Sequence, residues 1–237
     1  MKTIELSARM QALVNMVSEG RVVCDVGCDH GWVSIYLVQK GIAQRVYAMD
    51  VRTGPLERAK EHIARYQLEE SIETRLSDGL TNLSVGEADC MICAGMGGPL
   101  MMKILTEGRD KARGMKELIL QPQSELTMFR RFLREEGYKI VAEDMVLEDG
   151  KFYPMMKVEP VEKQENRNLN TEEQQLWDAY GEHLLKGKHP VLKKYLLKGK
   201  EQAESLLQHL KEKGTASDRI EQLQKELELL EKAMGYM

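Results

Sequence analysis

Residues 22–31 read Val-Val-Cys-Asp-Val-Gly-Cys-Asp-His-Gly, and the rest of the chain is best understood from this stretch. It begins with apolar residues typical of a buried strand and breaks at a glycine. Asp25, Gly27 and Gly31 stand in the order Asp-x-Gly-x-x-x-Gly, and an amphipathic helix follows. A strand, a glycine turn and a helix in this order predict a cofactor cradle at the carboxyl end of a parallel strand.

Length and composition narrow the class of protein. The chain has 237 residues, 42% of them hydrophobic and 30% charged, as expected for a folded globular protein with one sizeable α/β domain and a smaller one. The net charge of −4 provides no global attraction to nucleic acid, so any such binding needs local basic patches. We find no secretory signal and no apolar stretch long enough to cross a bilayer, and we expect a cytoplasmic protein.

The four cysteines at positions 24, 28, 90 and 93 allow a zinc hypothesis, because Cys90-x-x-Cys93 has ligand-like spacing. Both residues fall inside an apparent strand, however, where positions three apart point to opposite faces. We therefore expect buried thiols and no metal site.

Apolar patterns alternate between strands and helices over the first 160 residues. A helix is expected over 3–18, and strands over 22–26, 45–50, 71–77, 88–94 and 118–120, with helices between them. Two further strands, 139–147 and 153–158, lie close enough to pair as an antiparallel hairpin. The pattern predicts a doubly wound α/β sheet with an antiparallel pair at one edge.

Polar residues and glycines follow several of these strands. Asp50 ends the second strand about 20 residues after the glycine turn, where an acid usually holds a ribose diol. Asp78-Gly79 follows the third strand, where the acid could bond an exocyclic adenine amine, although Asp-Gly is also a common turn. Three glycines in residues 95–98 let the backbone approach a ligand, and Met96 offers an apolar surface to a flat ring.

Two classes of cofactor enzyme compete for this pattern. Nicotinamide enzymes carry Gly-x-Gly-x-x-Gly, and this chain has Asp29 in place of the middle glycine. Methyltransferases that use S-adenosylmethionine carry an acid two residues before the first glycine, as Asp25 does here, and also the terminal hairpin. The residues favour a methyltransferase.

The composition changes after Pro160, and residues 161–237 show only helical patterns. One helix is expected from Thr171 to Leu185, a second after Pro190, and a third after a turn at 214–217. The second helix has an apolar stripe and the third a heptad pattern, so we predict an antiparallel coiled-coil hairpin. The stripe comprises Leu192, Leu196, Ala203, Leu206 and Leu210, and the heptad positions are Ile220, Leu223, Leu227, Leu230 and Met234.

Lysines gather at the start of this region, with no acid between residues 186 and 200. They are Lys186, Lys188, Lys193, Lys194, Lys198 and Lys200. Such a cluster can neutralise phosphates, and it can equally be a solvated helix face. Arg9, which precedes the glycine turn in sequence, can likewise bind an anion or simply be a solvated arginine.

Three segments together carry a family resemblance: the Asp-Val-Gly-Cys-Asp-His-Gly turn, the Ala-Gly-Met-Gly-Gly loop at 94–98, and Leu-Ile-Leu-Gln-Pro at 118–122. With the C-terminal helices, the chain resembles the bacterial tRNA (adenine(22)-N1)-methyltransferase family, often called TrmK. The resemblance implies a class I, Rossmann-like methyltransferase domain over 1–160 and a helical coiled-coil domain over 161–237 that binds tRNA. After His30 this chain has Gly31-Trp32, where we expect Ala-Tyr in many members of the family.

The resemblance also implies site residues. Asp29 would be the catalytic residue. From the basic residues themselves, and not from the resemblance, we hypothesise that Arg9, Lys193, Lys194 and Lys198 contact tRNA. The S-adenosylmethionine site would comprise Asp25, Gly27, Cys28, His30, Gly31, Asp50, Asp78, Gly79, Ala94, Gly95, Met96 and Gly97.

N1 of adenine already has a free lone pair, so the enzyme mainly has to align it with the methyl group. We expect Asp29 to accept a hydrogen bond from the adenine N6 amine, as a positioning group more than a general base. The chain lacks the Asn/Asp-Pro-Pro-Tyr loop of enzymes that methylate N6 itself. No obligate protein partner is evident, and a monomer is expected.

Two alternatives remain. One is a small-molecule methyltransferase whose helices form a lid or dimerisation element. The other is a non-catalytic RNA-binding module with a vestigial cofactor cleft, which the intact set of Asp25, Gly27, Gly31 and Asp50 argues against.

Overall fold

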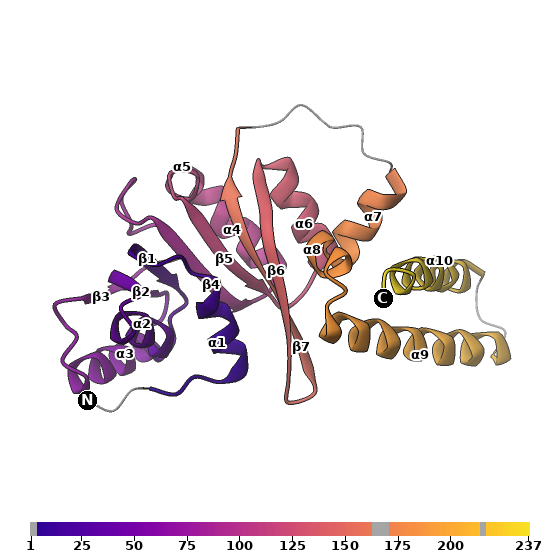
Figure 1. Ribbon diagram of the computed structural model, residues 1–237, viewed down its shortest axis with the longest axis horizontal. Helices are drawn as coiled ribbons and strands as arrows, with labels where there is room; N and C mark the ends of the chain where they lie inside the picture. The colour runs from indigo at the N-terminus through magenta and orange to yellow at the C-terminus, as the bar shows by residue number, and fades with distance from the viewer. Residues whose placement is uncertain (1–3, 163–170, 214–216) are drawn as a thin grey trace. The chain divides into compact units, whose positions relative to one another are not determined.

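A seven-stranded sheet forms the centre of the first part of the chain, in the order β3-β2-β1-β4-β5-β7-β6 (Figure 1). The parallel strands are β1 Arg21–Val26, β2 Ala43–Asp50, β3 Ile72–Leu76, β4 Cys90–Met96 and β5 Glu117–Pro122. The last two strands, β6 Tyr138–Glu148 and β7 Lys151–Pro160, are antiparallel, and β7 lies between β5 and β6. The predicted doubly wound sheet with a terminal hairpin is confirmed.

The computed structural model describes residues 4–162, 171–213 and 217–237. It separates the chain into two compact units, Met1–Glu165 and Asn166–Met237. The predicted domain boundary at residue 160 lies at the end of β7, and most of the predicted turn at 214–217 lies outside the described residues. Among the described helices, none is both long and apolar enough to span a membrane.

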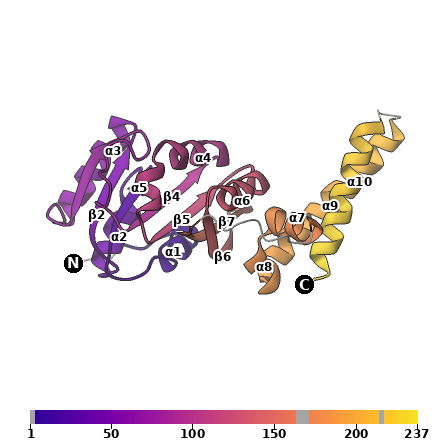
Figure 2. The same cartoon turned by 90° about the horizontal axis from the view of Figure 1, so that it is seen from above.

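Helices cover both faces of the sheet in the first unit. They are α1 Ala8–Asn15, α2 Trp32–Gln39, α3 Thr53–Arg65, α4 Gly98–Glu107, α5 Arg109–Arg113 and α6 Leu126–Glu135. The first three pack on one face, and α4, α5 and α6 pack on the other, where α4 and α6 lie next to each other (Figure 2). Cys90 and Cys93 belong to opposite faces, as predicted, and all four cysteines are buried free thiols.

Two local predictions for this unit were wrong, and one helix was missed. The first helix is shorter than expected: it begins at Ala8, where the Ser7 side chain accepts a hydrogen bond from the backbone N–H of Met10 at 3.4 Å. Helix α5 was not anticipated. Strand β4 continues through Gly95 to Met96 by means of a register shift, because Met96 still pairs with Pro122 of β5.

The second unit is helical, with α7 Thr171–Tyr180, α8 Glu182–Lys186, α9 Pro190–Glu212 and α10 Ser217–Met234. The single helix predicted up to Leu185 is wrong, since Gly181 interrupts it with a φ of 90° that favours glycine. Helices α9 and α10 lie side by side as an antiparallel hairpin (Figure 1 and Figure 2). Lys200 Nζ and Glu231 Oε1 are 2.9 Å apart across it.

The hairpin seam buries Leu192, Leu196, Ala203, Leu223, Leu230 and Ala233. Leu206 was expected on the same stripe but is 40% exposed. Its neighbour Leu207 is half-buried instead, because four residues after Ala203 the helix returns to the same face. The predicted stripe is therefore wrong only at Leu206, since Leu192, Leu196 and Ala203 are buried and Leu210 is half-buried. The supercoiling of a coiled coil stays a prediction.

Candidate active site

A cavity of about 560 Å³ lies at the carboxyl ends of the parallel strands. This volume is in the range of roughly 300–1,000 Å³ that small-molecule sites usually have. The predicted site residues that line it are Arg9, Asp25, Gly27, Cys28, Asp29, Asp50, Asp78, Gly79, Ala94, Gly95 and Met96. The cavity lies at the point where β1 and β4 are adjacent and the chain switches faces, which is where open α/β sheets bind ligands.

The turn after β1 depends on Gly27. Its backbone has a φ of 76°, and its N–H donates to the carbonyl of Met49 at 2.8 Å. A Cβ at this position would lie 2.3 Å from Cε of Met96, whose sulfur accepts a 3.7 Å hydrogen bond from the Cys93 thiol. Gly27 therefore allows both the turn and the close approach of Met96, which lines the same cavity.

Asp50 connects the ends of β1 and β2. It is only 5% exposed, and its two carboxylate oxygens accept backbone N–H bonds from Arg52 at 2.9 Å and from Asp29 at 3.4 Å. The carboxylate lines the cavity and has further lone pairs available for a ligand. Asp50 thus both holds the turn that carries Asp29 and presents an acceptor to the cavity.

Asp25 is a second buried carboxylate of the cavity, and Ser34 Oγ donates to its Oδ2 at 2.6 Å. Burial raises the pKa of Asp25 to about 6; the Ser34 bond opposes this shift and the nearby charge of Asp50 adds to it. Two acids close together in a buried setting create a negative potential, which a positively charged ligand would relieve.

Asp29 differs from both of these acids because its side chain is exposed, at 60% of its full area. Its backbone occupies the left-handed region with a φ of 49°, which is uncommon for a residue other than glycine. Its carboxylate Oδ2 lies 3.5 Å from Nε2 of His30. Asp29 lines the cavity and remains accessible to a second substrate.

Three predicted donor-site residues do not line the cavity. His30 has its carbonyl bonded to His62, Gly31 precedes α2, and Gly97 precedes α4. A Cβ at Gly31 would lie 3.2 Å from Cβ of Ala59, so this glycine lets α2 and α3 approach each other. Cys28 does line the cavity, and burial raises its pKa, which keeps the thiol protonated.

Arg9 is held at the cavity by several contacts. Its Nη1 donates to Gln121 Oε1 at 3.0 Å, its backbone N–H donates to Glu148 at 3.1 Å, and its guanidinium lies 5.0 Å from the ring centroid of Tyr153. These contacts order a long, flexible cation beside the cavity, so the arginine is available for an anion at low entropic cost.

About half of the residues that line the cavity were not predicted as site residues from the sequence. The missed residues are Met10, Leu13, Val26, Val33, Val51, Arg52, Ser77, Ile92, Leu100, Ile104, Gln121 and Gln123. Gln121, Val51 and Arg52 could have been found, since each lies at or just beyond a strand end. Met10 and Leu13 come from α1, the helix that also carries the predicted Arg9, but as apolar members of a helical pattern they gave no sign of lining a cavity.

The predicted tRNA-binding lysines belong to the second unit. Lys186 and Lys200 have acidic partners from elsewhere in that unit, Glu182 at 2.6 Å and Glu231 at 2.9 Å respectively. Lys193, Lys194 and Lys198 are exposed on α9, and the first two form no ion pair with any residue that the structure describes. Within the described ranges, no three His, Cys, Asp or Glu side chains are grouped to hold a metal ion.

Comparisons with known proteins agree with this architecture. Residues 6–156 match the family model for a methyltransferase domain. The tRNA (adenine(22)-N(1))-methyltransferase of Bacillus subtilis is 36% identical over 159 residues, which is 67% of each chain.

Two solved structures extend the similarity to nearly the whole chain. The crystal structure of the B. subtilis M1A22 tRNA methyltransferase TrmK has a TM-score of 0.85 at 29% identity and covers 97% of this chain and 99% of its own. Sp1610 of Streptococcus pneumoniae, solved in complex with S-adenosyl-L-methionine, has a TM-score of 0.85 at 29% identity over 97% and 100% of the two chains.

Proposed function

The chain belongs to the family of bacterial tRNA (adenine(22)-N1)-methyltransferases, and we propose that it transfers a methyl group from S-adenosylmethionine to N1 of adenine 22 in the D-arm of tRNA. One observation carries the proposal: a single cavity joins the glycine turn, the buried Asp50 and the exposed Asp29. A donor site and a group that can meet a nucleobase are thus adjacent.

The residues of the cavity fit S-adenosylmethionine. When bound, this donor supplies an electrophilic methyl group on a positively charged sulfur. Asp50 would accept hydrogen bonds from the ribose hydroxyls, and Met96 would cover a face of the adenine ring. The negative potential from Asp25 and Asp50 matches the positive charges of the donor.

Asp29 would then orient the target adenine. Its carboxylate would accept a hydrogen bond from the N6 amine, which fixes the ring with N1 facing the donor. The negative charge would also stabilise the positive charge that grows on the ring as N1 is alkylated. No base has to create the nucleophile, so alignment in a site that excludes water is the main contribution.

N1 lies on the pairing edge of adenine, so the target base has to be unpaired or flipped out of a helix, at a cost of a few kcal/mol. Contacts with the tRNA backbone can offset this cost. We assign such contacts to Arg9 at the cavity and to Lys193, Lys194 and Lys198 on α9. With tRNA as its substrate, the enzyme would work in the cytoplasm, as a monomer without a protein partner.

The direct test is transfer of a labelled methyl group to unmodified tRNA, followed by mapping of the methylated nucleoside. We expect 1-methyladenosine at position 22. A tRNA with guanine at position 22 serves as the control and should accept no label. Transfer to small molecules but not to tRNA would support the small-molecule alternative.

The role of Asp29 is tested by Asp29→Ala. The variant should lose methyl transfer while it still binds S-adenosylmethionine, measured by calorimetry. Asp149→Ala is a matched control, because Asp149 is an exposed aspartate with the same φ of 49°, located in the β6–β7 turn. Wild-type turnover by Asp29→Ala would remove Asp29 from the mechanism.

A further inference from the structure

One side chain outside the cavity, His62 of α3, contacts the turn that carries Asp29. Its Nδ1 lies 2.9 Å from the backbone carbonyl oxygen of His30, 32 residues earlier in the chain. A carbonyl oxygen only accepts hydrogen bonds, so Nδ1 of His62 has to carry the proton and donate it. This contact links α3 to the peptide group between His30 and Gly31, one peptide after the one that joins Asp29 to His30.

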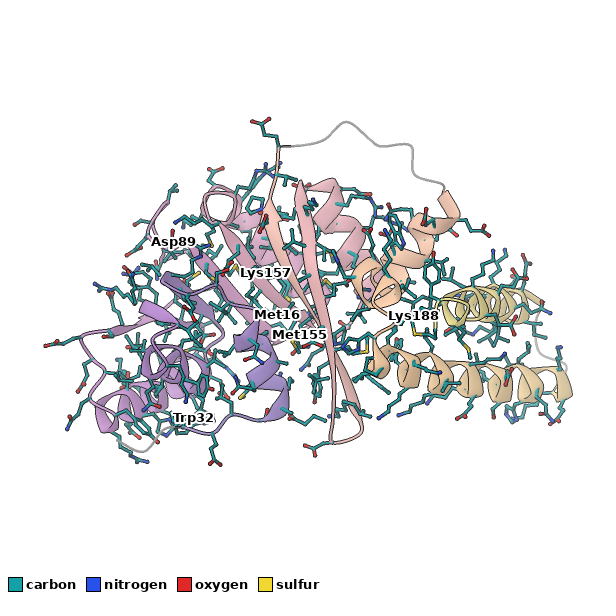
Figure 3. The ribbon with its side chains drawn as sticks, viewed as in Figure 1. Met16, Trp32, Asp89, Met155, Lys157 and Lys188 are labelled. Carbon is teal, nitrogen blue, oxygen red and sulfur yellow. The ribbon has the colours of Figure 1, made fainter. Side chains whose placement is uncertain are left out.

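The ring of His62 is itself held in place. It stacks on Trp32, with 4.0 Å between the ring centroids and an angle of 20° between the ring planes. Trp32 is the first residue of α2, and Figure 3 shows it at the end of the sheet opposite Asp89, which precedes β4, and therefore on the side of the strands' carboxyl ends. Trp32 thus fixes the plane of the imidazole, and with it the direction of the Nδ1–H bond.

The Asp29 turn needs such a contact. A non-glycine residue in the left-handed region has an intrinsic cost, and such a conformation persists only where the surroundings enforce it. On one side, the N–H of Asp29 makes a long bond of 3.4 Å to Asp50. On the other side, the N–H of Gly31 donates to Cys28 at 2.8 Å, and the His30 carbonyl accepts from His62.

The same contact affects the Asp29 carboxylate through His30. The imidazole of His30 lies 3.5 Å from Asp29 Oδ2, and the backbone at position 30 sets the point from which this side chain extends. Holding that carbonyl therefore restrains the residue next to Asp29 in the turn, from which the neighbour of the Asp29 carboxylate extends.

We propose that His62 is a positioning residue for Asp29, with Trp32 holding its ring. The proposal rests on the function of Asp29 proposed above. It differs from a purely structural role, in which His62 would only connect α2 with α3 and its loss would reduce stability without a specific effect on the chemical step.

Two substitutions separate the two contacts of His62. His62→Phe keeps an aromatic ring for stacking on Trp32 and removes the donor. His62→Asn loses the stacking and keeps an N–H donor close to the position of Nδ1. Glu61→Ala, an exposed neighbour on the same helix, is the control.

For His62→Phe we expect kcat to fall about tenfold, with the KM for tRNA and the Kd for S-adenosylmethionine within about twofold of wild type. His62→Asn should recover most of the loss, and Glu61→Ala should behave as wild type. Wild-type kcat in His62→Phe would overturn the proposal. So would a loss of thermal stability in both His62 variants that fully explains their lower activity.

A measurement without substrate distinguishes a failure of the positioning role of His62 from a failure of the proposed methyltransferase function. In the ligand-free protein, ¹⁵N spectra should show neutral His62 protonated at Nδ1, and the Gly31 amide should exchange faster in His62→Phe than in Glu61→Ala. Unchanged exchange would overturn the positioning role even if tRNA is methylated. If wild type transfers no methyl group to tRNA, the proposed function fails, and the exchange data alone decide whether His62 holds the turn.

Discussion

At the scale of single residues, Gly27 combines two requirements, a left-handed backbone and room for Met96. Gly27→Ala should therefore raise the Kd for S-adenosylmethionine about tenfold or more, because an added Cβ displaces the Met96 side chain within the cavity. Isothermal calorimetry measures this effect.

Gly41→Ala is the matched control for backbone strain. Gly41 has a φ of 69°, and nothing lies within 4 Å of a Cβ built there. The Gly41→Ala substitution should therefore lower the free energy of unfolding by about 1 kcal/mol, from the strained backbone alone, and leave the binding of S-adenosylmethionine unchanged. Equal binding losses in the two variants would mean that strain, and not the contact with Met96, weakens the site.

Asp25 leads to a pH prediction. Its pKa is about 6 in the folded protein, compared with about 3.9 in an unfolded chain. Between these values the folded state retains a proton that the unfolded state releases, so this residue lowers stability as the pH rises from 4 to 6, and the penalty is complete above 6. Asp25→Asn removes the ionisation and retains an acceptor for Ser34.

The stability of Asp25→Asn relative to wild type should thus increase between pH 4 and pH 7 by up to about 3 kcal/mol, which is the value of a two-unit shift. Urea denaturation of both ligand-free proteins at several pH values measures the difference. A difference that does not change with pH would contradict the burial argument.

At the scale of elements, the α9–α10 hairpin is defined by which face of α9 is covered. Leu196 is fully buried and the adjacent Leu197 is 42% exposed. Leu196→Ala should cost about 2–5 kcal/mol of the free energy of unfolding of this unit, and Leu197→Ala about 0.5 kcal/mol or less. Urea denaturation monitored by circular dichroism compares them. Similar costs would place the seam on a different face.

At the scale of the whole molecule, recognition of tRNA would involve both units. Changing Lys193, Lys194 and Lys198 to Ala should raise the Kd for tRNA and reduce the slope of log Kd against log salt by about 2, because roughly 0.7–0.9 is lost with each phosphate contact. Filter binding at several salt concentrations measures both quantities.

A second triple variant controls for the change in net charge. Lys211, Lys213 and Lys225 are exposed lysines of the same unit, and their substitution by Ala changes the net charge equally. Their loss should affect tRNA binding much less. If both triple variants weaken binding to the same extent, the lysine cluster on α9 is not a specific contact.

Helices and strands with a regular apolar periodicity could be predicted from the sequence. Element bounds that depend on a single residue, such as a glycine with a positive φ, could not. The alternation of strands and helices and the terminal hairpin are visible in the apolar periodicity. Gly181 lies inside a pattern that reads as one continuous helix, and the extension of β4 to Met96 depends on its pairing with Pro122. Leu206 was misplaced because adjacent leucines at 206 and 207 leave the seam ambiguous.

The sequence by itself determined the Asp25–Gly31 turn and the acid at Asp50, because covalent order places them after consecutive strands and parallel strands bring their carboxyl ends together. Tertiary structure alone decided that Met96 covers Gly27, that Gln121 and Tyr153 hold Arg9, and that His62 reaches the Asp29 turn. These contacts join residues up to 144 positions apart. They depend on how helices pack on the sheet, which no local pattern of residues records.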